Sequence, residues 1–301
     1  MINKINLTSD FRLSRIVHGQ MRIAGWKMSG QELLRLMEEE IELGVTSFDH
    51  ADIYGHYHCE ALLGEVIKLK KGIRNEIEII TKCGIKLVSE KNPGQKIKYY
   101  DYGYAHIVKS VNDSLANFRT DRIDLLLLHR PAPFFDPEAV EKAFSILKRD
   151  GKVLHFGVSN FGPGQFELLS SFTGEPLVTN QVEISPFCLE HFENGNIDFF
   201  QKEKIKPMAW GPLAGGKILY PYDDKGTRIL QALKEVSEEL NILPVEKIIY
   251  AWLLKHPASI IPVVGSGRIE RIKYAVEALN VDMSLEQWYK IYIASGGKEL
   301  P

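Results

Sequence analysis

The chain has 301 residues, of which 45% are hydrophobic and 25% are charged, and this is the ordinary composition of a globular protein. Its formal net charge of −2 argues against nucleic acid or an anionic membrane surface as the dominant partner. No apolar run approaches the ~20 residues that cross a bilayer, so we expect a soluble protein.

Cysteine usage and the first residues indicate the compartment. Cys59, Cys83 and Cys188 stand at unrelated spacings without a CxxC pair, so the sequence predicts neither a zinc site nor a disulfide framework. The segment Met1–Asn6 lacks the apolar core of a signal peptide. We therefore expect a cytoplasmic protein without a metal site.

The first elements in chain order are a hairpin and a buried strand. Lys4–Arg12 alternates apolar and polar residues around a turn at Thr8–Asp10, which predicts a β-hairpin that caps the floor of a barrel. Ser14–His18 predicts the first barrel strand. Short apolar runs without alternation then recur, as is typical of parallel strands buried on both faces. They predict strands at Val45–Asp49, Ile77–Lys82, Ile123–Leu128, Val153–Ser159, Leu177–Glu183, Lys206–Trp210 and Ile260–Val264.

Amphipathic segments separate these strands. The first, Gln31–Leu43, follows Ser29, which is suited to cap a helix N-terminus, and precedes Gly44, which is suited to end a helix. The other segments predict helices at Tyr57–Leu69, His106–Phe118, Pro137–Arg149, Gln165–Ser171, Glu190–Glu203, Thr227–Leu240, Pro244–His256, Ile269–Leu279 and Leu285–Ala294.

The alternation of eight strands with helices, and the lack of a Pro/Gly/Ser-rich linker, predict one closed α/β barrel of the (β/α)8 (TIM) type rather than two open sheets. We expect this barrel to form a single domain over residues 1–301. One connection, Gly84–Tyr104, is long enough to suggest a function. Two interpretations of this loop are about equally favoured. The loop forms a wall of the substrate pocket, or it is a surface loop whose tyrosines anchor it by packing.

Ionisable side chains stand at the ends of three predicted strands. These are Asp49, Lys82 and His129, and Tyr54 follows Asp49 in the next loop. Because the C-terminal strand ends of such a barrel form its active site, we expect the four to share one pocket. An ammonium beside a phenol lowers its pKa and eases proton donation to a developing alkoxide, and we predict that Lys82 does this to Tyr54. Asp49 is predicted to keep Lys82 protonated, and His129 to orient a carbonyl oxygen.

Ordered segments of the chain resemble the aldo-keto reductases. Phe48–Gly55 (FDHADIYG), Thr81–Lys82 and Leu126–Pro131 (LLLHRP) are similar to the segments that carry the Asp, Tyr, Lys and His tetrad of that family. Gly157–Phe161 (GVSNF) and Asn180–Glu183 (NQVE) are similar to its nicotinamide-binding segments. The resemblance extends over essentially the whole chain and points to the bacterial general oxidoreductase branch.

The resemblance implies an NADPH-dependent oxidoreductase that reduces aldehydes or ketones to alcohols by direct hydride transfer. Tyr54 would be the general acid, with Asp49, Lys82 and His129 as the other catalytic residues. The substrate pocket would include Trp26 together with Tyr54 and His129. The implied partner is a small carbonyl compound, with a monomer as the default and an oligomer left open.

The resemblance also implies an NADP(H) site. The predicted strand Ile260–Val264, the turn Gly265–Gly267 and the helix start after it form a cradle of backbone N–H groups for phosphate. Arg268 and Arg271 can bind a 2′-phosphate, which favours NADP(H) over NAD(H). The residues expected to contact the cofactor are Gly19, Met21, Arg22, Asp49, Ser159, Asn160, Gln181, Trp210, Gly211, Leu213, Gly265, Ser266, Gly267, Arg268 and Arg271.

One departure from the family and two rival functions stay open. Many members carry Glu and Asn shortly after the phosphate-binding arginine, whereas Ile272–Ala275 follows Arg271 here, so the strength of the NADP preference is not predicted. One rival is a nucleotide-binding, redox-sensing regulatory module of the same fold with little turnover. The other is a lyase or aldolase with Lys82 as a Schiff-base amine, which would require a depressed lysine pKa.

Overall fold

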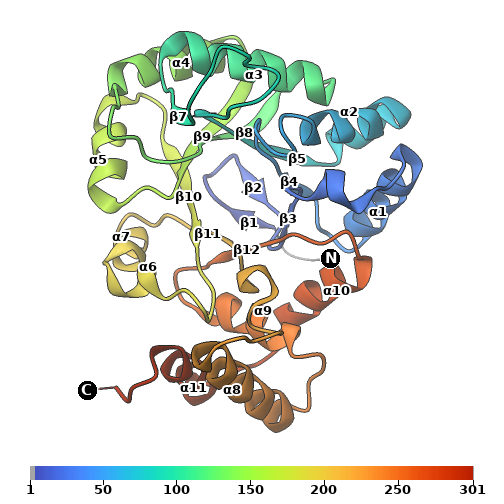
Figure 1. The fold of residues 1–301 in the computed structure, drawn as a ribbon, viewed down its shortest axis with the longest axis vertical. Helices are drawn as coiled ribbons and strands as arrows, with labels where there is room; N and C mark the ends of the chain where they lie inside the picture. The colour runs from blue at the N-terminus through green and yellow to red at the C-terminus, as the bar shows by residue number, and fades with distance from the viewer. Residues whose placement is uncertain (1–3, 301) are drawn as a thin grey trace. The chain divides into compact units, whose positions relative to one another are not determined.

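A computed structural model describes residues 4–300 of the chain. Eight parallel strands close into a barrel in the order β10-β11-β12-β3-β4-β5-β8-β9 (Figure 1). This confirms the predicted barrel. The strands are β3 Val17–Gly19, β4 Ser47–Asp49, β5 Glu78–Cys83, β8 Ile123–Leu128, β9 Val153–Ser159, β10 Leu177–Glu183, β11 Met208–Trp210 and β12 Ile261–Val264.

The described residues divide into two compact units, one of residues 4–180 with 265–267 and the other of residues 181–264 with 268–300. The single domain expected over residues 1–301 stays a prediction. The first unit holds the helices α1 Gly30–Glu42, α2 Cys59–Leu69, α3 Tyr104–Phe118, α4 Pro137–Arg149 and α5 Pro163–Phe172. The second holds α6 Glu190–Glu193, α7 Asn196–Lys202, α8 Asp224–Leu240, α9 Glu246–Lys255, α10 Ile269–Glu277 and α11 Leu285–Gly296.

The N-terminal hairpin pairs β1 Ile5–Asn6 with β2 Arg12–Leu13 in antiparallel register. The residues that follow it reach the first residue of β4, because the Ser14 N–H donates to Ser47 Oγ over 2.8 Å. The Phe11 ring stacks on His155 near the start of β9, with 4.2 Å between ring centroids. The hairpin therefore covers the amino ends of these strands, as predicted, and leaves their carboxyl ends free for chemistry.

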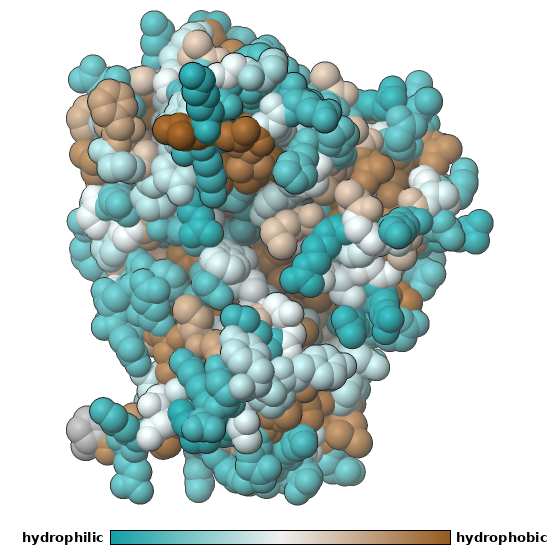
Figure 2. Space-filling view, viewed as in Figure 1, coloured by the Kyte–Doolittle hydropathy of each residue, from teal (hydrophilic) through white to brown (hydrophobic). Residues whose placement is uncertain are grey.

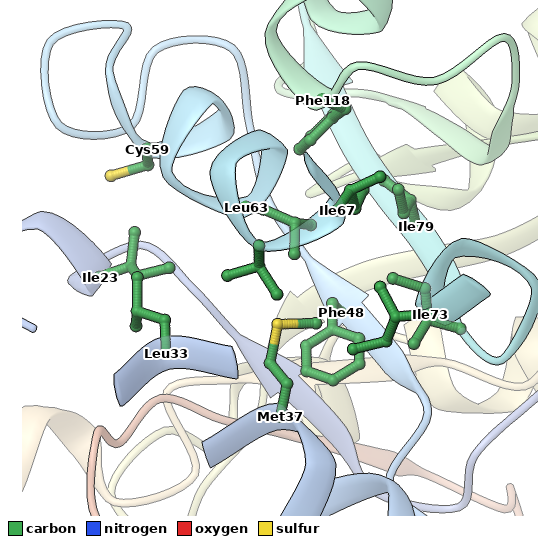
Figure 3. Packing of buried hydrophobic residues seen from close by; sticks show 12 residues of the cluster. Ile23, Leu33, Met37, Phe48, Cys59, Leu63, Ile67, Ile73, Ile79 and Phe118 are labelled. Atoms are coloured by element: carbon green, nitrogen blue, oxygen red, sulfur yellow. The ribbon is translucent and has the colours of Figure 1, made fainter. Parts of the chain in front are cut away.

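The core of the first unit lies between β4 and its helices. In Figure 3, Leu33 and Met37 of α1 and Leu63 of α2 point toward the cluster around Phe48 of β4. Helix α1 begins as predicted, since the Ser29 hydroxyl accepts from the Glu32 N–H over 3.3 Å and the Glu32 carboxylate accepts from the Ser29 N–H over 2.7 Å. This capping box fixes the helix that later carries Glu40.

Helices α2 and α3 approach each other at a glycine. A Cβ on Gly64 would lie 1.9 Å from the backbone oxygen of Asn117. Alanine is favoured over glycine in a helix by about 1 kcal/mol, but here it would force the two helices apart. We expect Gly64→Ala to lower the free energy of unfolding by about 1–3 kcal/mol in urea titrations. Gly72→Ala, where nothing lies within 4 Å, is the control and should have little effect. Equal stability of both variants would contradict the close approach.

The second unit is held by an aromatic cluster. The Trp252 ring of α9 stacks on Trp288 of α11 at 5.0 Å. Each indole N–H donates to the backbone oxygen of the other residue, over 3.1 and 3.0 Å. The polar edge of each buried indole is thereby satisfied.

Three predicted regions differ from the structure. The helix predicted over Glu190–Glu203 is broken into α6 and α7, because Gly195 adopts a left-handed φ of 82° that ends one helix and starts the other. The long connection Gly84–Tyr104 holds a small sheet, in which β6 Ile85–Lys86 pairs with β7 Tyr99–Tyr100. The helix predicted over Ile269–Leu279 leaves the α conformation after Glu277 and continues as a 3-10 turn.

The surface shows no dominant apolar face in the view of Figure 2, where hydrophobic residues lie in separate patches among hydrophilic ones. Within residues 4–300, no helix combines the length and the apolarity that a bilayer span requires. The expected cytoplasmic location and monomeric state stay predictions.

Candidate active site

The strand register brings Asp49 and Lys82 to one face of the barrel. Asp49 is the last residue of β4 and pairs with Ile80 of β5, so Lys82, two residues further along β5, points to the same side as Asp49. Both side chains are buried, with 4% of the Asp49 side chain and 1% of the Lys82 side chain exposed. An ion pair this deep must satisfy its own hydrogen bonds, because water does not reach it.

The Lys82 ammonium has close partners on every side. Its Nζ lies 2.7 Å from both carboxylate oxygens of Asp49 and 2.7 Å from the backbone oxygen of His50. The Tyr54 hydroxyl lies 3.2 Å away. The carbonyl of His50 was not predicted, and no sequence pattern indicates it because it is a backbone group. Together these acceptors aim the amine at the phenol.

A tight turn brings Tyr54 back over the strand ends. The Tyr54 N–H donates to the Ala51 backbone oxygen over 3.1 Å, and Gly55 follows with a left-handed φ of 56°. A Cβ on Gly55 would lie 2.6 Å from Cys59 Sγ at the start of α2, so only glycine fits without a shift. This turn holds the phenol against the ammonium.

His129 completes the group from the end of β8. Its ring meets the Tyr54 ring edge to face, with 5.8 Å between centroids. Tyr102 of the long connection Gly84–Tyr104 holds the backbone of Arg130, the residue after His129. The Tyr102 hydroxyl donates to the backbone oxygen of Arg130 and accepts from its N–H over 2.9 Å. Within residues 4–300, His129 Nδ1 is buried and has no hydrogen-bond partner. The ring therefore keeps unused hydrogen-bonding capacity beside the phenol.

Burial decides the protonation of this site. Burial, followed by the charges of Lys82 and Arg130, holds the pKa of His129 well below its usual value, so the imidazole is neutral near pH 7. Burial opposes the charge of Lys82, but the Asp49 carboxylate and Tyr54 outweigh it and raise the lysine pKa. Lys82 is therefore an ammonium, as predicted.

Lys82 lowers the pKa of Tyr54 as predicted, but the net direction of the shift is opposite to the expected one. Burial raises the pKa of its phenol, and the nearby Lys82 ammonium, which does lower it, does not cancel that effect. Tyr54 is thus held as the protonated phenol. This state suits a proton donor, whose conjugate base Lys82 would then stabilise.

The predicted cofactor residues of the first unit lie at strand ends. Gly19 ends β3 and is followed by the exposed Met21 and Arg22, and Ser159 ends β9. Asn160 adopts a left-handed φ of 63°, and its Nδ2 donates to the backbone oxygen of His129 over 3.3 Å. This bond ties a predicted nicotinamide-binding segment to His129.

The turn Gly265–Gly267 follows β12 along the chain and is part of the first unit. Ser266 is buried, whereas Gly265 is exposed. A Cβ on Gly267 would lie 2.7 Å from Trp26 Cδ2, so the turn approaches Trp26 more closely than any side chain would permit. The backbone of the turn therefore packs directly against the Trp26 ring.

The predicted residues of the second unit lie within β10, at and after the end of β11, and at the start of α10. Gln181 lies within β10 and Trp210 ends β11, and Gly211 follows with a left-handed φ of 68° before Leu213. Arg268 is the N-cap residue of α10, Arg271 lies in its first turn, and both are exposed. Exposed guanidinium groups at a helix start are suited to bind an anion.

Two pairs of buried polar side chains, Asp52 with Ser110 and His18 with Glu40, were not predicted. Asp52 accepts from the Ser110 hydroxyl over 2.8 Å, and burial with the nearby Glu60 raises its pKa to about 8. His18 of β3 pairs with Glu40 of α1, and both are fully buried. Neither pair has a sequence signal, because their members are far apart along the chain.

Comparisons with known proteins identify the family and support the fold. A sequence profile of the Aldo/keto reductase family matches residues 15–295. The oxidoreductase YcsN of Bacillus subtilis is 46% identical over 300 residues, covering 100% of both chains. The 6-dehydroglucose reductase of Agrobacterium fabrum is 41% identical over 300 residues, covering 99% of this chain and 100% of the relative. The glycerol dehydrogenase of Gluconobacter oxydans has the same fold, with a TM-score of 0.84 at 23% identity over 99% of this chain and 97% of that one.

Proposed function

The chain belongs to the aldo/keto reductase family, and we propose that it reduces aldehydes or ketones to alcohols with NADPH as the hydride donor. The contact between the Lys82 ammonium and the Tyr54 hydroxyl, 3.2 Å long and braced by Asp49, carries this proposal. This contact supports Tyr54 as the proton donor, because the ammonium stabilises the phenolate that remains, and carbonyl reduction requires such a donor.

In the proposed reaction, the reduced nicotinamide supplies a hydride when it is bound. His129 orients the carbonyl oxygen through a ring N–H, and Tyr54 gives its proton to that oxygen as the C–H bond forms. Lys82 stabilises the resulting phenolate, and Asp49 keeps Lys82 charged and in place. The product is an alcohol, and Tyr54 regains its proton from solvent.

NADP(H) is the proposed cofactor because the donor set suits it. Two of the three residues of the turn Gly265–Gly267 have no side chain, which supports approach of a phosphate to its backbone, and α10 begins directly after the turn. We propose that Gly19, Met21, Arg22, Asp49, Ser159, Asn160 and Gly265–Gly267 of the first unit each contact the cofactor. For the second unit we propose Gln181, Trp210, Gly211, Leu213, Arg268 and Arg271.

Arg271 provides a test of the NADP preference. We expect Arg271→Ala to raise the Kd for NADPH about tenfold and to leave that for NADH unchanged, because the guanidinium would bind only the 2′-phosphate. The measurement is titration of the nicotinamide fluorescence of each cofactor. Lys273→Ala, an exposed cation on the same helix, is the control. An equal loss for both cofactors would contradict a 2′-phosphate site at Arg271.

The substrate class is proposed from a relative. The 6-dehydroglucose reductase of Agrobacterium fabrum shares 41% of its residues with this chain over its full length. We therefore propose sugar-derived aldehydes as substrates, bound beside Tyr54 and His129, with Trp26 as a further pocket residue. A panel of sugar aldehydes and simple aliphatic and aromatic aldehydes, measured by NADPH consumption, tests this.

The two rival functions are not favoured. The regulatory module predicts tight NADPH binding without turnover on any member of the panel. The contacts among the four proposed catalytic side chains, Asp49, Tyr54, Lys82 and His129, instead support turnover. The Schiff-base lyase requires a lysine of depressed pKa, and Asp49 instead raises the pKa of Lys82.

The pH dependence of kcat/KM follows from the direction of the two pKa shifts. The pKa of His129 is lowered, so its protonation should not reduce the rate between pH 6 and 8, although a free imidazole has a pKa of about 6.5. The pKa of Tyr54 is raised above its usual value of about 10, so the phenol stays protonated and the rate should fall only in strongly alkaline solution. A rate that drops below pH 7 with a pKa near 6.5, and no longer does so in His129→Gln, would contradict a neutral histidine.

A further inference from the structure

A fully buried histidine joins helix α1 to the turn Gly265–Gly267. Nδ1 of His18 on β3 lies 2.9 and 3.0 Å from the two carboxylate oxygens of Glu40 on α1. Its Nε2 lies 2.9 Å from the backbone oxygen of Ser266. Both His18 and Glu40 are 0% exposed, and residues of these types are rarely buried so completely without a role. The proposed reaction uses neither of them.

The proton positions follow from the partners. A carbonyl oxygen only accepts hydrogen bonds, so Nε2 of His18 must carry a proton and donate it to Ser266. At Nδ1, either an imidazolium donates to the Glu40 carboxylate, or a protonated Glu40 donates to a neutral ring. Both arrangements share one proton within a pair of zero net charge, which suits its burial. Glu40 thereby fixes the tautomer that presents an N–H to Ser266.

The histidine ring has little freedom to turn. The Trp26 ring stacks on it, with 5.4 Å between centroids and 4° between the planes, and Phe48 meets its edge at 5.9 Å. Trp26 also contacts the turn itself at Gly267. Gln20 Nε2 lies 3.4 Å from Nδ1 of His18. The turn is therefore held by the Trp26 ring and by the His18 hydrogen bond.

This hydrogen bond orients a peptide plane. In a trans peptide the C=O and the following N–H point in opposite directions. When the Ser266 oxygen is held at His18, the Gly267 N–H is therefore turned away from His18. Glycines on both sides of Ser266 would otherwise allow the plane to rotate. We infer that His18 and Glu40 are positioning residues that preset the Ser266–Gly267 peptide so that the turn binds the phosphate of NADP(H).

The inference rests on the proposed function, because the turn is taken to bind a cofactor phosphate. The test variant is His18→Phe, which keeps a planar ring against Trp26 and removes both nitrogens. Since it leaves Glu40 without its partner, the double variant His18→Phe/Glu40→Leu is made in parallel. His155→Phe, a histidine that stacks on Phe11 at the barrel floor, is the matched control.

Two measurements are made on each folded variant. The first is the Kd for NADPH by fluorescence titration, which we expect to rise about tenfold in both His18 variants, the effect of about one lost hydrogen bond. The KM for NADPH should rise similarly, with a much smaller change in kcat at saturating NADPH. The second is hydrogen–deuterium exchange of residues 262–268 without cofactor, which should become faster because the turn is no longer tethered. His155→Phe should match the wild type in both.

The outcomes separate the inference from the proposed function. Unchanged NADPH affinity together with unchanged exchange would overturn the inference, as would a fall in kcat at unchanged Kd. If the wild type itself does not bind NADPH, the proposed function fails. The exchange measurement then decides alone, and unchanged exchange would show that His18 does not tether the turn.

Discussion

Tyr54→Phe is expected to lower kcat for carbonyl reduction by about 10³-fold, within the range of 10² to 10⁴ that a general acid contributes. The phenol oxygen is the group that Lys82 approaches at 3.2 Å, and phenylalanine keeps the ring packed against His129 while removing the proton. Steady-state NADPH consumption with the best aldehyde of the panel measures the effect.

Two controls accompany this variant. The Kd for NADPH should change less than about twofold, because the hydroxyl is assigned to the substrate oxygen and not to the cofactor. Tyr57→Phe removes a hydroxyl in the same loop, one that accepts from the Leu87 N–H over 3.0 Å, and it should turn over nearly normally. Near-normal turnover of Tyr54→Phe would remove Tyr54 from its assigned role.

Asp49→Asn is expected to cost about 3–5 kcal/mol of unfolding free energy, since it leaves the Lys82 ammonium buried without its carboxylate. The pair is almost completely shielded, with 4% and 1% of the two side chains exposed. The variant should also lose most reductase activity, because Lys82 would no longer be held charged beside Tyr54. Urea unfolding and steady-state kinetics measure the two effects.

The exposed pair Lys109 and Asp113 provides a matched control, with 71% and 57% of the side chains exposed. Asp113→Asn should cost at most about 0.5 kcal/mol. The double variant Asp49→Leu/Lys82→Met removes both charges and should regain much of the lost stability without any activity. If Asp49→Asn were as stable as Asp113→Asn, the buried ion pair would not have the strength assigned to it.

Much of the fold could be predicted because the barrel strands are consecutive apolar residues. The predicted bounds agree with β8, β9 and β10, where runs such as Leu125–Leu128 are buried on both faces and end at polar residues. The break at Gly195 was not predicted, because a glycine within a helical pattern does not reveal its φ. The two-residue strands of the long connection were also missed, since so short a pair has no periodicity.

The grouping of Asp49, Tyr54, Lys82 and His129 could be predicted from strand ends, but the electrostatics of the group could not. The sequence shows that Lys82 and Tyr54 come together, whereas the burial that raises the phenol pKa depends on the packing of the whole pocket. The hydrogen-bonded link from Glu40 through His18 to Ser266 could not be predicted from the sequence either. Its members are separated by 22 and 248 positions, and one contact is made by a backbone oxygen.

The most direct measurement follows deuterium from NADPH labelled at C4 of the nicotinamide into the product of an aldehyde substrate. Each of the two C4-labelled diastereomers is incubated separately with the wild type, and the alcohol is analysed by mass spectrometry. Direct hydride transfer beside Tyr54 predicts that one diastereomer places deuterium on the carbinol carbon and the other leaves none there. Alcohol without deuterium from either diastereomer, or with deuterium exchanged into water, would contradict hydride transfer at this site.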